Sequence, residues 1–389
     1  DRRTKMKRST DRILITHVGS LARPKDLMDM LLARNEGKPF DNSALARCTR
    51  EAVAEVVEKQ IECGVDIIND GELGKSNFSR YTKERLGGFV ERAASPDFKP
   101  TSIFGRDLLE FTEYFNRGGR TSIGHHARVF HCVEPLKYVG QEEVNADIAN
   151  LKFALQDKKY EEAFLPAVAP GTLEHWMKND FYKTNEEYLF AIADAMREEY
   201  KAIVEAGFIL QIDDPDLADA WQMHPKMSVA DYRKYQEMRI DALNHGLRDL
   251  PIDRIRFHMC WGSYHGPHKY DIPLKDIADL ILKVRADAYS IEASNPCHDH
   301  EWRVWEDTKL PDGKILIPGV VGHYSDFIEH PQAIADRLVR YAKIVGRENV
   351  IAGTDCGIGS RVGHPQVGWA KFQALAEGAR IATKELWDE

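Results

Sequence analysis

The stretch Arg256-Phe257-His258-Met259-Cys260-Trp261 combines the pattern of a buried strand with two metal-binding residue types spaced two positions apart. Residues i and i+2 of a strand point to the same face. We therefore expect the imidazole of His258 and the thiol of Cys260 to face one point, as two ligands of a zinc-like metal must. A packed histidine beside a buried free thiol would give the same pattern. The stretch predicts a metal site only if other segments supply further ligands.

Eight short hydrophobic segments, most of them separated by helical periodicity, extend this pattern along the chain. Strands are expected within residues 12–16, 65–69, 164–172 (a strand with its loop), 208–212, 255–260, 287–291, 314–321 and 349–354. The segments have the composition of strands buried on both faces, and polar residues collect at their carboxyl ends. This is the arrangement of an α/β protein with a (β/α)8 TIM barrel and a site at that rim. A doubly wound open sheet is the alternative, but it would not normally place chemistry at so many strand ends.

The length of 389 residues fits one large barrel domain spanning residues 1–389. A long insertion after the second strand, about residues 75–160, interrupts the regular pattern with frequent Gly and Pro and scattered aromatics. Insertions of this length form a lid, a substrate wall or a contact between subunits. A homo-oligomer is therefore possible.

Composition excludes several classes of protein. Charged residues make up 30% and hydrophobic residues 43%, which is typical of a soluble globular chain. The net charge of -9 and the lack of a basic stripe beyond the first ten residues argue against binding of nucleic acid. No apolar run is long enough to span a bilayer. Six scattered cysteines favour a reduced, cytoplasmic setting in which some thiols are free to bind metal.

A barrel would bring the ends of its fifth, sixth and eighth strands to one cavity. The residues offered there are two thiols, an imidazole and a carboxylate, a set that suits tetrahedral zinc: His258, Cys260, Glu292 and Cys356. Three more residues of ligand type follow Glu292 closely and are expected to be loop residues: Cys297, His298 and His300. The predicted cofactor is therefore Zn2+.

These four residues, in the motifs His258-Met259-Cys260, Ser290-Ile291-Glu292-Ala293-Ser294 and Asp355-Cys356-Gly357, resemble the zinc ligands of the cobalamin-independent methionine synthases. The resemblance covers nearly the whole chain and keeps the family's order of motifs. It implies that Val18, Gly19 and Ser20 form the loop that holds the homocysteine carboxylate. It also implies that Glu72 and Asp213 hold the amino group of homocysteine. Trp176, after Pro170-Gly171-Thr172, resembles a tryptophan of the folate pocket.

The reaction is less closely defined by the resemblance, because the chain matches only the catalytic one of the two barrels of full-length synthases. A gapless alignment on Gly319-Val320 places Tyr324 at the position of the catalytic histidine, with His323 one position early. Either side chain could donate the proton. Single-barrel relatives include core methionine synthases and the epoxyalkane:coenzyme M transferases. The stretches Trp261 to Pro267 and Ile315 to Val321 look similar to the latter enzymes as well.

The implied activity is zinc-dependent alkylation of a small thiol. A thiol of pKa about 8.5 is mostly protonated at neutral pH, and coordination to zinc removes its proton. Methyl transfer to homocysteine, making methionine, is the leading prediction, with a folate or a methylcorrinoid protein as the methyl donor. The alternative is opening of an epoxide by zinc-bound coenzyme M, whose sulfonate would need a basic residue such as Arg80, Lys83 or Arg120. A second alternative is a non-catalytic, zinc-stabilised binding protein.

Overall fold

Eight parallel strands form the centre of the fold, as the sequence predicts. The computed structural model describes residues 5–77, 81–93, 104–116, 128–359 and 361–388. The strands are β1 (Leu14–Ile15), β2 (Ile67–Ile68), β5 (Glu162–Val168), β7 (Ile209–Asp213), β8 (Ile255–His258), β9 (Ala288–Glu292), β10 (Ile315–Val321) and β11 (Ile351–Thr354). Their order in the sheet is β1-β11-β10-β9-β8-β7-β5-β2, and each pair in it is parallel.

The two ends of this sheet, β1 and β2, are joined by a few hydrogen bonds. The backbone N–H of Asp66 donates to the carbonyl of Ile15 at 3.0 Å. The hydroxyl of Thr16 donates to the carbonyl of Ile67 at 2.9 Å. The Asp66 carboxylate also accepts from the backbone N–H of Ile15 and from Arg12. The sheet is thus nearly closed, and the predicted (β/α)8 barrel is confirmed.

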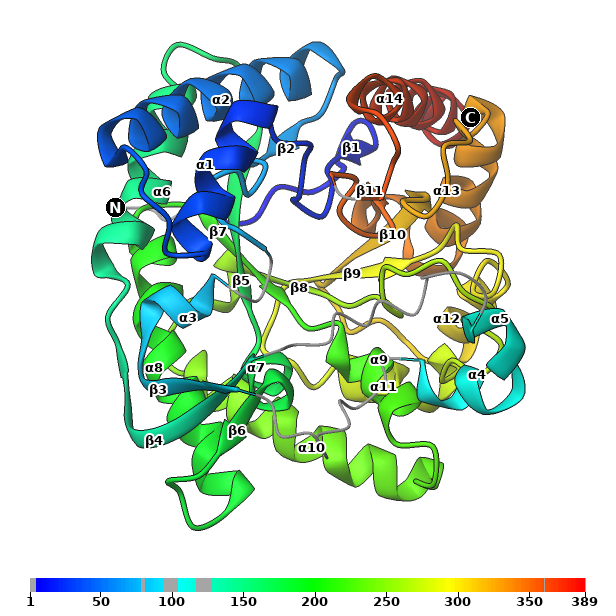
Figure 1. Ribbon diagram of the computed structural model, residues 1–389. Coiled ribbons are helices and arrows are strands. Elements are labelled where there is room, and N and C mark those ends of the chain that lie inside the picture. The colour runs from blue at the N-terminus through cyan, green and yellow to red at the C-terminus, as the bar shows by residue number, and fades with distance from the viewer. Residues whose placement is uncertain (1–4, 78–80, 94–103, 117–127, 360, 389) are drawn as a thin grey trace.

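Long amphipathic helices surround the strands (Figure 1). They are α1 (Lys25–Asn35), α2 (Asn42–Glu62), α6 (Gln141–Ala154), α8 (Asn185–Glu205), α10 (Val229–Gly246), α13 (Pro331–Val345) and α14 (Pro365–Trp387). Side chains cap several of them, because the first N–H groups of a helix have no partner within it. Asp41 accepts from the N–H groups of Ser43 and Ala44, and Thr184 accepts from that of Glu187.

Shorter helical elements lie between the strands and the long helices or, from β8 to β10, between successive strands. They are α7 (Pro170–Trp176), α9 (Asp216–Met223), η1 (Ile252–Arg254), η2 (Leu274–Asp276), α11 (Ala278–Ile281), η3 (Glu301–Arg303), α12 (Val304–Asp307) and η4 (Arg347–Asn349). The segment from Pro273 to Val284 is not one continuous helix. Ile277, with ψ near -7°, separates η2 from α11.

A second, three-stranded sheet contains two strands of the insertion after β2 and one strand that follows α7. Strands β3 (Leu86–Ala93) and β4 (Arg128–Tyr138) pair antiparallel, and β6 (Met177–Asn179) adds to β4 in parallel. Short helices α3 (Thr82–Arg85), α4 (Gly105–Glu110) and α5 (Thr112–Asn116) belong to the same insertion. Its last helix, α6, packs between α2 and α8 and so completes the outer ring of the barrel.

A charged side chain, Arg256, lies inside the barrel just below the carboxyl-terminal rim. Its guanidinium is 1% exposed and donates to Gln211 Oε1 at 2.7 Å, to Thr16 Oγ1 at 2.9 Å and to the His17 carbonyl at 2.7 Å. It also lies 3.4 Å from the centroid of the Phe164 ring. Burial lowers the pKa of Arg256 to about 9. The cost of burying this charge is offset by hydrogen bonds to Gln211 on β7 and to Thr16 and His17 after β1, so the guanidinium ties these two segments to β8.

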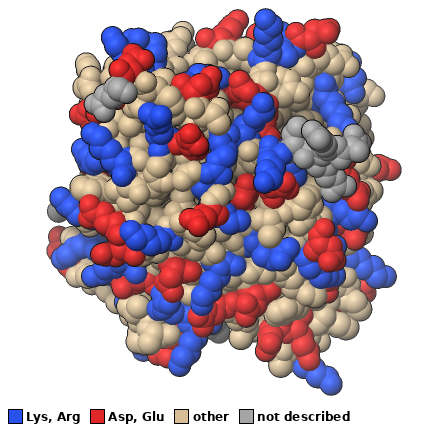
Figure 2. Space-filling model, turned by 180° about the vertical axis from the view of Figure 1, so that it is seen from behind, with Lys and Arg blue, Asp and Glu red and all other residues tan. Residues whose placement is uncertain are grey.

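The outer surface carries mixed charge. Figure 2 shows Lys and Arg side chains interspersed with Asp and Glu over the face that is turned away from the view of Figure 1. Within the described ranges, the helices are too short or too polar to cross a lipid bilayer.

We expect Arg256→Met to lower the free energy of unfolding by about 3 kcal/mol, because Gln211 Oε1 and the His17 carbonyl would stay buried without a donor. Urea denaturation followed by circular dichroism measures the change. Arg380→Met is the control, since Arg380 lies on the surface, where it pairs with Glu377, and it should leave the stability unchanged. Equal effects of both substitutions would contradict a structural role for the buried guanidinium.

Candidate metal centre

Three predicted ligands meet at the carboxyl ends of the strands. His258 ends β8, Cys260 follows it by two residues, and Cys356 follows β11. One donor atom of each lies within 4.8 Å of the others, and the two sulfur atoms are 3.8 Å apart. His258 and Cys260 are buried, whereas Cys356 is partly exposed. The barrel thus brings His258 and Cys260 close to Cys356, which lies far from them in the sequence.

The electrostatics of this cluster suit a metal ion. A hydrogen bond between the two thiols, together with the nearby His258, holds the pKa of Cys356 well below its ordinary value, while the same bond raises the pKa of Cys260. Among the described residues, neither ring nitrogen of His258 has a hydrogen-bond partner, although the side chain is 2% exposed. Buried polar atoms without partners are costly. Two thiols and an imidazole with free nitrogens fit zinc.

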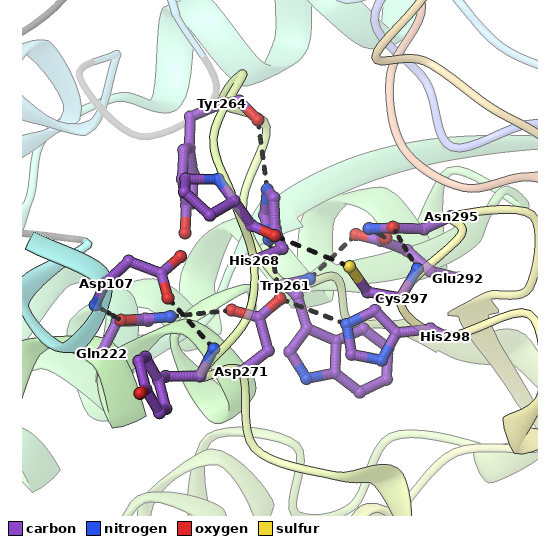
Figure 3. Close-up of polar contacts among 12 residues, drawn as sticks. Asp107, Gln222, Trp261, Tyr264, His268, Asp271, Glu292, Asn295, Cys297 and His298 are labelled. Atoms are coloured by element: carbon purple, nitrogen blue, oxygen red, sulfur yellow. Dashed lines mark hydrogen bonds and ion pairs between the residues drawn. The ribbon is translucent and has the colours of Figure 1, made fainter. Parts of the chain in front are cut away.

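Glu292, the predicted fourth ligand, lies beside this cluster and outside its 4.8 Å set. Its carboxylate accepts from the backbone N–H of Trp261 at 2.9 Å through Oε1. It accepts from the side-chain amide of Asn295 at 2.9 Å through Oε2. Figure 3 shows both contacts above the stacked rings of Trp261 and His298. The role of Glu292 as a ligand stays a prediction.

His323 and Tyr324, the two candidate proton donors, point to different places. His323 is 1% exposed, and its ring nitrogens have no hydrogen-bond partner in the described part of the chain. It lies near enough to Cys356 to help lower the pKa of that thiol. The hydroxyl of Tyr324 instead donates to the carbonyl of Ser294 at 2.8 Å. The geometry therefore favours His323.

A bulge in β10 precedes His323 and Tyr324. Gly319 pairs with Gly353, but the next paired residue on β10 is Val321, opposite Thr354. One more residue of β10 than of β11 lies between these two pairs, and the extra residue changes which side chains of β10 face the site.

The predicted carboxylate-binding loop, Val18-Gly19-Ser20, lies against Glu72. Gly19 has a φ of 146°, a backbone conformation that residues with side chains rarely adopt, and a Cβ there would come within 2.7 Å of Glu72 Oε1. Glu72 follows β2 and has a φ of 57°, an unusual value for a residue with a side chain. Ser20 packs against Gly357, next to Cys356. The loop and Glu72 therefore lie beside the metal cluster.

Asp213 ends β7 and is connected to the same loop by Gln211. The amide of Gln211 donates to Asp213 Oδ1 at 2.7 Å and also to the carbonyl of Val18. Its carbonyl oxygen accepts from Arg256, which fixes the orientation of the amide. Gln211 was not among the predicted site residues. Its polar side chain inside a buried strand, two residues before Asp213, is the signal that could have identified it.

Glu72 and Asp213 are two buried acids near the metal cluster, and the pair is called the acidic pocket below. Burial raises the pKa of Glu72 and raises that of Asp213 to about 7, and the charge of His258 acts in the opposite direction on both. Lys75, also missed by sequence reasoning, is buried, donates to the Pro166 carbonyl and partly offsets both shifts. Two desolvated carboxylates are stabilised when a cation arrives beside them.

Other candidate residues lie apart from the cluster or outside the described ranges. Trp176 ends α7, partly exposed, with its ring 4.6 Å from that of His175; its role in a folate pocket stays a prediction. Arg80 and Arg120 lie outside the described residues. Lys83 lies 6.0 Å from the centroid of the Phe130 ring in the second sheet. Cys297 is half-buried with its sulfur near the Pro267 carbonyl.

Known proteins resemble the chain over nearly its whole length. A family model for the catalytic domain of cobalamin-independent synthases matches residues 169–375. Methionine synthases from Thermococcus kodakarensis and Sulfurisphaera tokodaii are 22% and 23% identical, over 95% of this chain and 93% of each relative. A B12-independent methionine synthase from Shewanella sp. W3-18-1, solved with selenomethionine, shares 20% identity and a TM-score of 0.71 over 97% of this chain and 100% of that chain. The structural similarity supports the barrel fold.

We expect the purified protein to bind one zinc ion, and Cys356→Ala to weaken that binding at least about a hundredfold, because a thiolate ligand supplies much of the affinity. Competition with a chromophoric chelator measures the affinity. Cys297→Ala is the matched control: it removes a nearby thiol that lies outside the cluster and should leave the affinity unchanged. Equal losses in both variants would argue against the cluster as the metal centre.

Proposed function

The chain belongs to the cobalamin-independent synthase family, and on that premise we propose that it transfers a methyl group to the sulfur of homocysteine and so makes methionine. The observation that carries the proposal is the position of the Glu72–Asp213 pocket directly beside the cluster of His258, Cys260 and Cys356. A thiol activated at the cluster would have its amino-acid end within reach of the two acids.

His258, Cys260 and Cys356 would hold zinc, with Glu292 as a further ligand. A zinc ion bound there would favour the thiolate form of a thiol at neutral pH, and the thiolate is the nucleophile. The three residues supply two sulfurs and one nitrogen from the ends of two strands, β8 and β11. Closed structural zinc sites usually take four Cys or His ligands. The set in this chain is therefore better suited to a reactive centre than to a purely structural one.

The acidic pocket selects the thiol. Glu72 and Asp213 provide two buried carboxylates for the ammonium group of homocysteine. The backbone of the Val18-Gly19-Ser20 loop would bind the substrate carboxylate, since Gly19 leaves the backbone accessible. Selenomethionine, bound in a structural neighbour, is an analogue of the expected product.

His323 would complete the reaction as the proton donor. Transfer forms the bond between sulfur and the methyl carbon and breaks the bond between that carbon and the donor. When the donor is a folate, the nitrogen that leaves then needs a proton. A ring nitrogen of His323, buried beside Cys356, would supply it.

We expect homocysteine to be methylated and coenzyme M not to be, because the pocket beside the cluster carries carboxylates and coenzyme M carries a sulfonate. Product formation with methylcobalamin or methyltetrahydrofolate, followed by mass spectrometry, measures the preference. Glu72→Gln should raise the KM for homocysteine about 10- to 100-fold by removing a charged partner of the ammonium. Alkylation of coenzyme M alone, with an epoxide, would move the assignment to epoxide opening.

We expect His323→Asn to lower kcat about 10²- to 10⁴-fold with little change in the KM for the thiol, as loss of a general acid does. Tyr324→Phe keeps the ring and loses only the hydrogen bond to the Ser294 carbonyl, so kcat should stay within about fivefold. Steady-state kinetics on both variants decide between the two residues. A larger loss in Tyr324→Phe would identify the tyrosine as the donor instead.

A further inference from the structure

Both carboxylate oxygens of Glu292 are engaged by donors that belong to the loops around it. Oε1 accepts from the Trp261 N–H and Oε2 from the Asn295 amide, each at 2.9 Å. The side chain is 2% exposed, so bulk water does not compete for these bonds. Figure 3 shows the Glu292 carboxylate lying between its two donors. A buried carboxylate with two neutral donors is well solvated by the protein and has a stable position of its own.

The Asn295 side chain is fixed in the orientation that makes it a donor. Its Oδ1 accepts from the backbone N–H of Cys297 at 3.0 Å, so its NH₂ group must face Glu292. The Asn295 carbonyl also accepts from the N–H groups of His298 and Asp299, both at 2.8 Å. The tight turn after Glu292 therefore holds the amide in place before any ligand binds.

The other donor, the Trp261 N–H, is held by packing and charge. The Trp261 indole donates to the Ile272 carbonyl at 2.7 Å. The His298 ring stacks on it, with centroids 3.7 Å apart and planes at 16°. His298 is bound in turn by Glu301 at 2.8 Å and by Asp271 at 3.2 Å. This anchoring fixes the backbone between Cys260 and the donor group.

We propose that the Trp261 N–H and the Asn295 amide form a docking position for the Glu292 carboxylate, and that Asn295 is the positioning residue that sets how strongly Glu292 competes with a thiol for the metal. The proposal rests on the proposed function and concerns the same site. A docked carboxylate leaves a coordination position to the substrate sulfur. A carboxylate that lacks these hydrogen bonds would bind the metal more tightly, and the substrate sulfur would have to displace it.

The test compares two substitutions of Asn295. Asn295→Asp keeps the acceptor for the Cys297 N–H and places an oxygen against Glu292, and Asn295→Ala removes the amide without adding charge. We expect both to raise the affinity for Zn2+ about tenfold, the effect of one lost hydrogen bond to a charged group. Binding of homocysteine, followed by the absorption spectrum of the Co2+-loaded protein, should weaken by a similar factor.

The Glu292→Gln background separates positioning from general damage. There the Asn295 substitutions should change neither Zn2+ affinity nor homocysteine binding, because the carboxylate they act through is gone. Asn244→Ala is the matched control: Asn244 also accepts from a backbone N–H and donates to a carbonyl, but on the outer helix α10. It should leave both affinities unchanged.

A lower Zn2+ affinity in both Asn295 variants would overturn the docking position. So would equal changes of Zn2+ affinity and homocysteine binding when the Asn295 substitutions are made in the wild-type and in the Glu292→Gln background. Wild-type protein that binds Zn2+ and homocysteine while both Asn295 variants behave identically to it would also overturn the dock, but would leave the proposed function intact. Failure of wild-type protein to bind Zn2+ would overturn the metal centre and the dock together.

Discussion

The close packing of Gly319 against Asp355 is the constraint on which the site depends. A Cβ on Gly319 would lie 2.5 Å from the Cα and backbone nitrogen of Asp355, so only glycine lets the end of β11 approach β10 this closely. Asp355, next to Cys356, then accepts from the N–H of Ser294 at 3.1 Å and from its hydroxyl at 2.6 Å. One close approach thus places a thiol and also fixes the loop that follows Glu292.

The second constraint is the polar layer inside the barrel, which ties the substrate pocket to the core. Arg256 orients Gln211, and Gln211 joins Asp213 to the carbonyl of Val18. A hydrophobic layer of the same volume would be at least as stable, because burying a guanidinium costs several kcal/mol before its hydrogen bonds are counted. The polar layer therefore adds no stability over a hydrophobic layer, but it fixes the positions of pocket groups that come from different strands.

The sequence predicts the structural elements that follow from a local, repeated pattern of residues. It misses the features that depend on contacts between residues far apart in the sequence. The eight barrel strands and most long helices follow from hydrophobic periodicity and strand-end chemistry, and three of the four expected ligands lie in one cluster. Strands β3, β4 and β6 were not predicted, because they pair with partners that lie far away in the sequence. The orientation of Glu292 depends on the Asn295 amide, and the position of His323 on a bulge after Gly319. Neither feature has a periodic signal.

Zinc K-edge X-ray absorption on the purified protein tests the central claim, that a thiol is activated at a cluster of two cysteines and a histidine beside an acidic pocket. The method counts the sulfur neighbours of the metal directly. The account predicts two sulfur neighbours in the protein alone and three after addition of homocysteine, with no change after addition of coenzyme M. Bound zinc with an unchanged sulfur count in the presence of homocysteine would contradict it.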